Sequence, residues 1–500
     1  MVRVFVIFTI VVFAAVFHIS AEPQVGFGPG LQDWGYVTVR PGAHMFWWLY
    51  YTTANVVNHV DRPLVIWLQG GPGAKPQVGF GPGLQDWGYV TVRPGAHMFW
   101  WLYYTTANVV NHVDRPLVIW LQGGPGASST GYGNFEELGP LDLFLGERNF
   151  TWVRNYNVLF IDNPVGTGFS YVDYDSALTR SNKEIALDLV DLLRGFYKHA
   201  PEFESVPLHI FSESYGGKMA SEFAYELEKA IEAGTIKCNL KSAGLGNSWI
   251  SPIDSVLSWA PFLLQTGYVD MDGFEKIQKA ALDTKKAVDD EKWQLATDLW
   301  GYTEVVIMRE TDGVDFYNIL KRIYKPSVQK KLFSYRMGRT SGAALRDLTN
   351  FDEIDRDKIL SDLMNGQVKQ TLRIPSNVTW GGQSSKVFRT LEVDFMKPCT
   401  EVLAKLLDET AVKVAVFTGQ LDLIVATPGT VEWINRLNWS GLDGYLAAKR
   451  TSIVVDKYIE GYQRQNRNFA VYWANRAGHM VPADNPAFMD YVLAQTTGVN

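Results

Sequence analysis

Short apolar runs alternate with helical patterns along the middle of this chain. Residues 158–161 form an apolar run of strand length, residues 242–246 form a second strand-like stretch, and the segments between them carry apolar residues at helical spacing. Regular alternation of strands and helices predicts a parallel sheet whose strands are connected by crossover helices. We therefore predict an α/β fold with a central, mostly parallel sheet.

A second kind of pattern follows in the later part of the chain. Residues 253–375 are mostly amphipathic helix, as around Trp300, and strand patterns return at residues 413–417 and near Phe469. A helical stretch of this length between two strand regions indicates an insertion into one α/β domain. The sequence thus predicts a first core part, an inserted helical cap and a second core part, at residues 76–252, 253–375 and 376–500.

The most informative stretch is residues 211–217, Phe-Ser-Glu-Ser-Tyr-Gly-Gly, which ends an apolar run of strand type. A helical pattern with one apolar face begins directly after it. A strand, a sharp turn and a helix around a serine predict the nucleophile elbow of an α/β-hydrolase fold, with Ser214 exposed on the turn. Small residues at Ser212 and Gly216 let the two backbones cross closely, although Ser212 replaces the glycine usual at that flank.

A catalytic acid and base must follow the serine on later strands, in the order Ser, Asp, His. Asp422 comes after the strand-like run 414–417, and His479 comes after the run 469–473. In such a triad His479 accepts the proton of Ser214, and Asp422 holds the imidazole in the useful tautomer. Each residue alone is also explained by an ordinary turn or loop, but their shared order and context predict catalysis of acyl transfer.

Four motifs resemble signatures of the serine carboxypeptidase family. Residues 120–129 resemble the pattern W-L-N-G-G-P-G-C-S-S, and residues 162–171 resemble a second signature. Residues 213–217 and 478–482 complete the ordered set around the serine and the histidine. The likeness covers about residues 85–490 and is greatest to the retinoid-inducible branch of the family. It implies an α/β-hydrolase fold and the removal of single residues from the C-termini of peptides.

The resemblance also implies two sets of binding residues. The oxyanion hole would consist of the backbone N–H groups of Gly124 and Tyr215, because fixed donors there stabilise the tetrahedral intermediate. The carboxylate of the substrate would be bound by a carboxamide, a glycine N–H group and two glutamates, here Gln122, Gly123, Glu137 and Glu213. Glu136 is a rival for the position of Glu137. Met480, next to the base, is expected to border the pocket of the leaving residue.

The two glutamates predict a pH dependence. Crowded carboxylates raise one pKa of the pair, so the protonated member becomes a hydrogen-bond donor to the carboxylate of the substrate. Loss of that proton as pH rises would weaken peptide binding, and we therefore expect better peptide hydrolysis in acid. At the lowest pH values the trend is opposed, because His479 must stay neutral to act as a base.

Three positions depart from the family pattern. Gln122 replaces an asparagine and is one methylene longer, which could shift the carboxylate anchor and the specificity. Ala127 replaces a cysteine that is usually in a disulfide, and Gln420 replaces an aspartate that often stands two residues before the catalytic one. None of these changes removes a member of the triad.

One block of the sequence occurs twice. Residues 23–74 recur without mismatch as residues 76–127, with a period of 53. Two perfect copies indicate a recent tandem duplication or an error of sequence assembly rather than a solenoid, whose repeats diverge and number three or more. The second copy continues into Ser128 and should fill the sheet, so we predict that residues 23–75 lie outside the core fold. Their apolar strands are then an aggregation hazard.

The first 21 residues are typical of a secretory signal peptide, with a charged start, a 14-residue apolar core and small residues at the end. The alternative is a membrane anchor, for which this apolar core is short. Sequons at Asn149, Asn377 and Asn438 fit a glycosylated protein. Together these features predict a secreted protein or a protein of the lysosomal lumen.

Composition argues against several kinds of partner and cofactor. A net charge of −7 argues against nucleic acid, and the scattered histidines argue against a metal site. No cofactor is expected. The two cysteines, Cys238 and Cys399, are left open as a disulfide or as free thiols. The expected partners are C-termini of peptides or proteins; no membrane contact is expected after signal cleavage, and a homodimer is left open.

Two other functions stay open from the sequence alone. The same triad serves any acyl transfer, so an esterase or acyltransferase is one alternative. The other is a non-catalytic secreted homologue that acts by binding, an alternative that the duplication and Gln122 keep open. Glu213 and Glu137 favour the exopeptidase, because they suit a free carboxylate and serve no purpose for a neutral ester. The intact triad argues against the non-catalytic protein.

Overall fold

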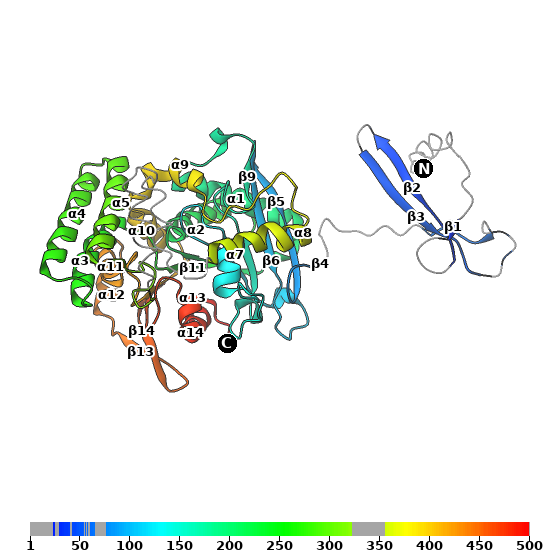
Figure 1. Ribbon diagram of the computed structural model, residues 1–500. Helices are drawn as coiled ribbons and strands as arrows, with labels where there is room; N and C mark the ends of the chain where they lie inside the picture. The colour runs from blue at the N-terminus through cyan, green and yellow to red at the C-terminus, as the bar shows by residue number, and fades with distance from the viewer. Residues whose placement is uncertain are drawn as a thin grey trace. The chain divides into compact units, whose positions relative to one another are not determined.

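The computed structural model divides the chain into two units, which are described separately (Figure 1). The first unit is Met1–Gly71 and the second is Pro72–Asn500. The predicted signal peptide and part of the predicted cap, residues 323–355, lie outside the described residues. The described residues are 24–25, 30–40, 43–54, 56, 58, 61–65, 77–322 and 356–499.

The second unit is built on a 12-stranded sheet with a parallel centre. The central strands lie in the order β15, β12, β11, β10, β7 and β8, and each pairs in parallel with its neighbour. Their bounds, in the same order, are Phe469–Ala474, Lys413–Gly419, Asn239–Gly246, Pro207–Glu213, Leu117–Leu121 and Asn157–Ile161. The predicted α/β fold with a central parallel sheet is confirmed.

Antiparallel strands extend both edges of this sheet. Beyond β8 lie β6 (Ala96–Tyr103), β5 (Leu84–Arg93) and β4 (Gln77–Val78), and β9 (Tyr171–Val172) pairs with β6. Beyond β15 lie β14 (Tyr458–Asn466) and β13 (Thr451–Val455). The sequence analysis did not predict the β13–β14 hairpin, although residues 453–455 are an apolar run.

Helices cover both faces of the sheet (Figure 1). The longer helices are α1 (Asn182–His199), α2 (Gly216–Glu232), α3 (Pro252–Gln265), α4 (Met271–Asp289), α5 (Trp293–Glu310), α7 (Arg356–Leu363), α9 (Ser385–Phe395), α10 (Thr400–Glu409), α11 (Thr427–Asn435) and α14 (Pro486–Thr497). The shorter ones are η2 (His112–Asp114), η3 (Ser129–Leu138), η4 (Trp152–Arg154), η5 (Asp175–Ala177), η6 (Pro201–Phe203), η8 (Met364–Val368), α8 (Lys369–Thr371), α12 (Leu442–Ala447) and α13 (Val481–Asp484). In the part of the chain that is described, no helix is both long and apolar enough to cross a membrane.

Side chains of the central strands alternate between two hydrophobic cores, one on each face of the sheet. On β10, Ile210 packs in one core and Phe211 in the other, and Ile119 and Trp120 on β7 divide in the same way. All of these side chains are fully buried. Burial on both faces explains why the central strands are continuous apolar runs in the sequence.

Three helices, α3, α4 and α5, follow β11 and lie side by side (Figure 1). The apolar face expected on α5 is buried, with Ala296 0% and Trp300 2% exposed. Further along the chain α9 packs against α5, whereas α10 packs against α2 of the core. Helical packing onto the inserted helices therefore continues past residue 375, and the chain re-enters the sheet at Lys413.

The first unit is a three-stranded sheet of β1 (Gln24–Val25), β2 (Leu31–Arg40) and β3 (Ala43–Tyr50). Strands β2 and β3 pair in the same register as β5 and β6, their counterparts in the second copy. Burial differs between the copies, since Phe46 is 50% exposed and its counterpart Phe99 is 0% exposed. Local sequence therefore sets the pairing of this hairpin, and only the second copy is packed in a core.

Both cysteines are free thiols, so the disulfide that the sequence left open is not formed. Sγ of Cys238 lies 3.3 Å from Oη of Tyr197. Sγ of the buried Cys399 lies 3.9 Å from the carbonyl oxygen of Lys218. Their two environments belong to separate parts of the core, and neither thiol contributes to the site described next.

Candidate active site

Ser214 stands on a sharp turn between β10 and α2. Its φ angle is 62°, in the left-handed region that non-glycine residues rarely adopt. The turn is fixed on both sides, because the N–H of Ser214 donates to the carbonyl of Gly246 at 3.0 Å and its own carbonyl accepts from the N–H of Trp249 at 2.9 Å. Strain of this kind persists only where the surrounding structure holds it, which is typical of functional sites.

Two small residues make room for that turn. A Cβ atom at Gly216 would lie 2.4 Å from the carbonyl oxygen of Leu121, so α2 can begin this close to β7 only with glycine there. Ser212, which replaces the usual glycine on the other flank, is fully buried. Its hydroxyl donates to the carbonyl of Gly244 at 3.0 Å, so the extra side chain is accommodated within the sheet.

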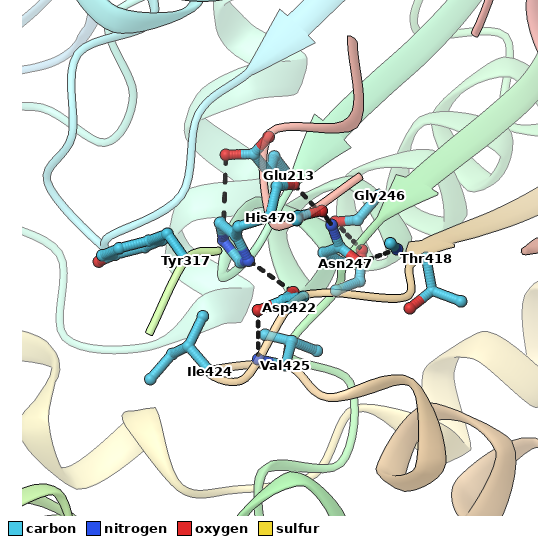
Figure 2. A network of polar contacts seen from close by, with 12 residues as sticks. Glu213, Gly246, Asn247, Tyr317, Thr418, Asp422, Ile424, Val425 and His479 are labelled. Atoms are coloured by element: carbon cyan, nitrogen blue, oxygen red, sulfur yellow. Dashed lines mark hydrogen bonds and ion pairs between the residues drawn. The ribbon is translucent and has the colours of Figure 1, made fainter. Parts of the chain in front are cut away.

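An imidazole and a carboxylate meet at the ends of two neighbouring strands (Figure 2). Asp422 follows β12 and His479 follows β15, and Nδ1 of His479 lies 2.8 Å from Oδ2 of Asp422. The two residues are 0% and 2% exposed. Oδ1 of Asp422 accepts a hydrogen bond from the N–H of Val425 at 3.1 Å. Burial raises the pKa of Asp422 from its ordinary value, and the proximity of His479 opposes that rise.

Further contacts fix the imidazole in place. The N–H of His479 donates to the carbonyl of Tyr317 at 2.6 Å, and the two rings meet edge to face with their centroids 5.1 Å apart. Nε2 of His479 lies 3.9 Å from Oε1 of Glu213, the residue before Ser214 (Figure 2). The ring nitrogen that does not contact Asp422 therefore faces the end of β10, which carries the serine.

Two buried glutamates share one amide beside the serine. Nε2 of Gln122 donates to Oε1 of Glu137 at 2.9 Å and to Oε1 of Glu213 at 3.1 Å. Oε1 of Gln122 accepts from Nε1 of Trp120 at 2.7 Å, and this donor fixes the orientation of the amide. Glu137 and Glu213 are each 3% exposed. Gln122 thus uses both of its N–H hydrogens to hold the two carboxyl groups together.

This carboxyl pair retains a proton that isolated carboxyl groups would lose. Burial, and then the charge of Glu137 and a hydrogen bond with it, raise the pKa of Glu213 well above its usual range. Burial raises the pKa of Glu137 to about 7, although hydrogen bonds from Glu213 and Gln122 lower it. Because two negative charges cannot both form readily in one desolvated site, the pair shares a proton in acid.

The rival residue Glu136 has a different partner. Its Oε2 atom lies 3.3 Å from Nη2 of Arg356, at the start of α7. Burial raises the pKa of Glu136, and the charge of Arg356 opposes the rise. Of the two neighbouring glutamates, Glu137 is therefore the one that is hydrogen-bonded to Gln122 and coupled to Glu213.

A glycine turn after β7 lies directly against the serine. A Cβ atom at Gly123 would lie 2.6 Å from Cβ of Ser214 and 2.9 Å from the backbone nitrogen of Tyr215. Gly124 has a φ angle of 112°, which residues with a side chain rarely adopt. Two backbone segments, one ending in Gly124 and one beginning at Tyr215, therefore meet beside Ser214.

Most of the residues that the sequence singled out line one cavity. Asp422 and Tyr215 lie behind its wall and are fully buried. Gly123 and Gly124 line the cavity beside the serine, and Met480 lines it beside the imidazole. The singled-out residues at its surface are Gln122, Gly123, Gly124, Glu137, Glu213, Ser214, His479 and Met480.

Aromatic side chains from distant segments also line the cavity. Trp249 follows β11, Trp300 lies on α5 and Phe395 ends α9. The ring of Phe395 packs with centroid distances of 5.4 Å to Trp249 and 4.7 Å to Trp300. The sequence did not identify these residues, because an aromatic residue on an amphipathic helix usually indicates only a buried face.

The chemistry available at this site is acyl transfer by a serine nucleophile. It combines a strained, half-buried serine, a buried imidazole bonded to a carboxylate, and a glycine turn that lies directly against the serine. In the described ranges, no group of three or more histidine, cysteine, aspartate or glutamate side chains is placed to hold a metal ion.

Comparisons with known sequences agree with this chemistry. A family model described as serine carboxypeptidase matches residues 23–82 and 76–497, so that each copy of the repeat is matched. The retinoid-inducible serine carboxypeptidase of Mus musculus is 45% identical over 406 residues, which cover 80% of this chain and 89% of that protein. The serine carboxypeptidase-like 51 protein of Arabidopsis thaliana is 38% identical over 434 residues, which cover 83% of this chain and 92% of that protein.

A solved structure shows the same fold. A prohormone-processing carboxypeptidase of Saccharomyces cerevisiae aligns with a TM-score of 0.70 and 22% sequence identity. The alignment covers 83% of this chain and 91% of the yeast chain. At this level of identity the likeness concerns the fold alone, and it agrees with the α/β architecture described above.

Proposed function

Since this chain belongs to the serine carboxypeptidase family and is a serine-type carboxypeptidase, we propose that Ser214, His479 and Asp422 are its catalytic triad. The strained turn at Ser214 and the 2.8 Å contact between His479 and Asp422 support this assignment. Asp422 accepts the hydrogen on Nδ1 and so holds the tautomer whose Nε2 can take the serine proton. The serine oxygen then attacks the carbonyl carbon of the last peptide bond.

The backbone N–H groups of Gly124 and Tyr215 form the oxyanion hole in this proposal. They stabilise the negative charge that develops on the carbonyl oxygen, and loss of one such donor typically costs about 10²–10³ in rate. Collapse of the tetrahedral intermediate transfers a proton from His479 to the leaving amine and frees the C-terminal amino acid. Water, deprotonated by His479, then hydrolyses the ester on Ser214.

The observation that carries the proposal is the carboxyl pair of Glu137 and Glu213 beside Ser214. With a shared proton, the pair can donate a hydrogen bond to the free carboxylate of the substrate, together with the N–H of Gly123. Gln122 holds the two carboxyl groups next to each other by donating a hydrogen bond to each. A neutral ester offers nothing for two buried carboxyl groups to bind, so an esterase or acyltransferase is less well supported.

The same pair accounts for an acidic working range. As pH rises, Glu137 and Glu213 lose their shared proton, and the site gains negative charge next to the carboxylate of the substrate. Peptide binding therefore weakens towards neutral and alkaline pH. His479 must be neutral to act as a base, which opposes this trend at the acidic end. Met480, which lines the cavity beside His479, borders the side chain of the leaving residue in this arrangement.

A secreted or lysosomal location completes the proposal. The side chains of Asn149, Asn377 and Asn438 are all exposed, as attachment of glycans requires. If the leader at residues 1–21 directs the chain into the secretory pathway, an endoglycosidase should increase its electrophoretic mobility. A chain from secreting cells that shows no such shift would contradict glycosylation.

The test of the proposed function compares two substrates that differ only at the C-terminus. An N-blocked dipeptide with a free carboxylate should be cleaved near pH 5, and its C-terminal amide should be cleaved far more slowly. Ser214→Ala should cleave neither, whereas Ser205→Ala, a change at an exposed serine outside the site, should behave as the wild type. Equal cleavage of acid and amide would contradict the role of the carboxyl pair, and an active Ser214→Ala would contradict the triad.

A further inference from the structure

Asn247 lies where the segments of the proposed triad meet (Figure 2). It follows β11, which is placed between β10, leading to Ser214, and β12, leading to Asp422. The residue is fully buried, and its φ angle of 37° is in the left-handed region, which asparagine tolerates better than most residues. Its backbone N–H donates to the carbonyl of Phe417, in β12, at 2.8 Å.

The side chain of Asn247 connects the loop of the base to the strand of the acid. Nδ2 donates to the carbonyl of His479 at 2.5 Å and to that of Gly478 at 3.0 Å. Oδ1 accepts from the N–H of Gly419, the last residue of β12, at 2.9 Å. A primary amide has two N–H hydrogens, and here both bind the loop that carries the imidazole.

The backbone next to Asn247 holds the nucleophile. The N–H of Ser214 donates to the carbonyl of Gly246, and the carbonyl of Ser214 accepts from the N–H of Trp249. The short segment 246–249 therefore contacts the serine turn, the strand of the acid and the loop of the base. The β10–β11 and β11–β12 ladders end at the pairs Glu213–Gly246 and Gly246–Phe417, so the bonds of this segment lie at the ends of those ladders.

The hydrogen bonds between β12 and β15 do not extend as far as His479. The ladder between β12 and β15 ends at Ala474, five residues before His479. Beyond it, the N–H of Leu421 donates to the carbonyl of Ala477 at 2.8 Å and draws the two loops together. Asn247 adds a bond to the carbonyl of His479 itself.

We propose that Asn247 is a positioning residue for catalysis, which fixes His479 relative to Asp422 and to the turn of Ser214. The inference rests on the proposed triad, and it assigns a role to a residue that touches no substrate atom. A displacement of about 1 Å at a reacting group can cost about 10²-fold in rate. A looser connection between the loops should therefore lower kcat, whereas KM, which reflects the carboxyl pair and the cavity wall, should change little.

A second buried asparagine offers a matched control. Asn157 is also fully buried, and its Nδ2 donates to the backbone carbonyls of His112 at 2.9 Å and Arg115 at 2.8 Å, with a longer contact of 3.4 Å to that of Pro116. Its Oδ1 accepts from the N–H of Thr105 at 3.0 Å. Asn157 thus makes the same kinds of bonds as Asn247, from Nδ2 to backbone carbonyls and from a backbone N–H to Oδ1, but at the first residue of β8, at the end of the parallel sheet away from the site.

The experiment compares Asn247→Asp and Asn247→Gly with Asn157→Asp and Asn157→Gly in the full chain. Aspartate has the shape of asparagine but, when ionised, cannot donate to the carbonyls, and glycine keeps the left-handed backbone without any side chain. The measurements are kcat and KM for the free-acid dipeptide, the rate of phosphonylation of Ser214 by an organophosphonate, and the melting temperature. We expect both Asn247 variants to lose about 10²-fold in kcat and in phosphonylation rate with KM within about threefold of the wild type.

The Asn157 variants should lose melting temperature but keep the kcat of the wild type in their folded fraction. The proposal is wrong if the Asn247 variants keep kcat and lose only stability. It is also wrong if both of them fail to fold while the Asn157 variants fold, because the role of Asn247 would then be structural. Failure of the proposed triad is a separate outcome, since it would leave Ser214→Ala active.

Discussion

Oε1 of Glu213 lies 3.9 Å from Nε2 of His479, so one carboxyl group of the Glu137–Glu213 pair faces the nitrogen that takes the serine proton in the proposed triad. An ionised carboxylate at this place would favour the charged imidazolium, which cannot accept the proton of the serine. The raised pKa of Glu213 keeps the group protonated in acid and avoids this. In the proposed mechanism, a single proton would therefore allow the pair to bind the carboxylate of the substrate and would also keep His479 able to act as a base.

The substitution Glu213→Gln replaces the titrating carboxyl group by an amide, which can donate a hydrogen bond to the substrate carboxylate at every pH. We expect KM for the free-acid dipeptide to rise much less between about pH 5 and about pH 8 than in the wild type, because an amide has no proton to lose in this range. At the acidic end kcat/KM should fall by no more than about tenfold, since one neutral donor replaces another. Steady-state kinetics across this pH range provide the measurement.

Glu275→Gln, a change at an exposed residue of α4, serves as the control and should leave the pH profile unaltered. A KM that rises as steeply in Glu213→Gln as in the wild type would show that the shared proton does not govern binding. The amidated dipeptide adds a second control, because its slow cleavage should not follow the titration of the pair.

Buried carboxyl groups also make the stability of the fold depend on pH. Folding raises the pKa values of Glu137 and Glu213, so the folded state binds more protons than the unfolded state above the ordinary carboxyl pKa. The contribution of this pair to the free energy of unfolding should therefore be largest below that pKa and should decrease as pH rises towards 7. Glu137→Gln should flatten this decrease, as measured by urea unfolding at several pH values. An unchanged slope would contradict the assignment of the pair.

Gly123→Ala should damage catalysis more than folding. Its Cβ atom would lie 2.6 Å from Cβ of Ser214, so the glycine turn and the serine turn must move apart. Displacement of an oxyanion donor typically costs about 10²–10³ in rate, and we expect kcat to fall by that factor. At Gly366 an added Cβ would meet nothing within 4 Å, so Gly366→Ala is the matched control and should keep its kcat. Equal kcat values for the two variants would disprove the expected clash.

The two copies of the repeat allow the same substitution to be made in two environments. Phe99 is 0% exposed and Phe46 is 50% exposed, although their neighbours in sequence are identical. We expect Phe99→Ala to cost about 3–5 kcal/mol of unfolding free energy and Phe46→Ala less than about 0.5 kcal/mol. Denaturant unfolding followed by loss of activity gives the value for Phe99, which lies in the second unit, and unfolding followed by far-UV circular dichroism of the whole chain gives the value for Phe46, which lies in the first. Similar costs would mean that both copies pack in a core.

Deletion of residues 23–75 should leave kcat and KM unchanged. The sheet that supports the site is formed by the second copy, through β5, β6 and β7. The first copy exposes large apolar side chains such as Trp34 and Tyr36, so its removal should also reduce aggregation in light scattering. A shortened chain that is inactive or aggregates as strongly as the full chain would contradict this view.

The fold and the centre of the site were predictable from sequence because few residue types can perform their chemistry. A serine elbow needs a strand, a tight turn and a helix, and the positions of Asp422 and His479 follow from the ends of later strands. The carboxyl pair of Glu137 and Glu213 could be predicted only from the family resemblance. The choice between Glu136 and Glu137 needed the contact of Glu137 with Gln122.

Other parts of the site were hidden because no local pattern marks them. Asn247 acts through bonds to residues far away in sequence, and an asparagine after a strand is usually a turn residue. The aromatic residues Trp300 and Phe395 lie on separate helices and meet only in the folded chain. Gly246-Asn247-Ser248, with an asparagine at a strand end, was the one available signal, since asparagine tolerates a left-handed backbone.

The repeat has a practical consequence for experiments that follow this protein by peptide mapping. Any fragment cut from within residues 23–74 has the same mass as the fragment cut from the corresponding positions of 76–127. One copy is a small sheet with exposed side chains, which should exchange its amide hydrogens readily, and the other is held in a large core. Hydrogen-exchange spectra of these fragments should therefore show two mass envelopes in a fixed one-to-one ratio, even if every molecule has a single conformation.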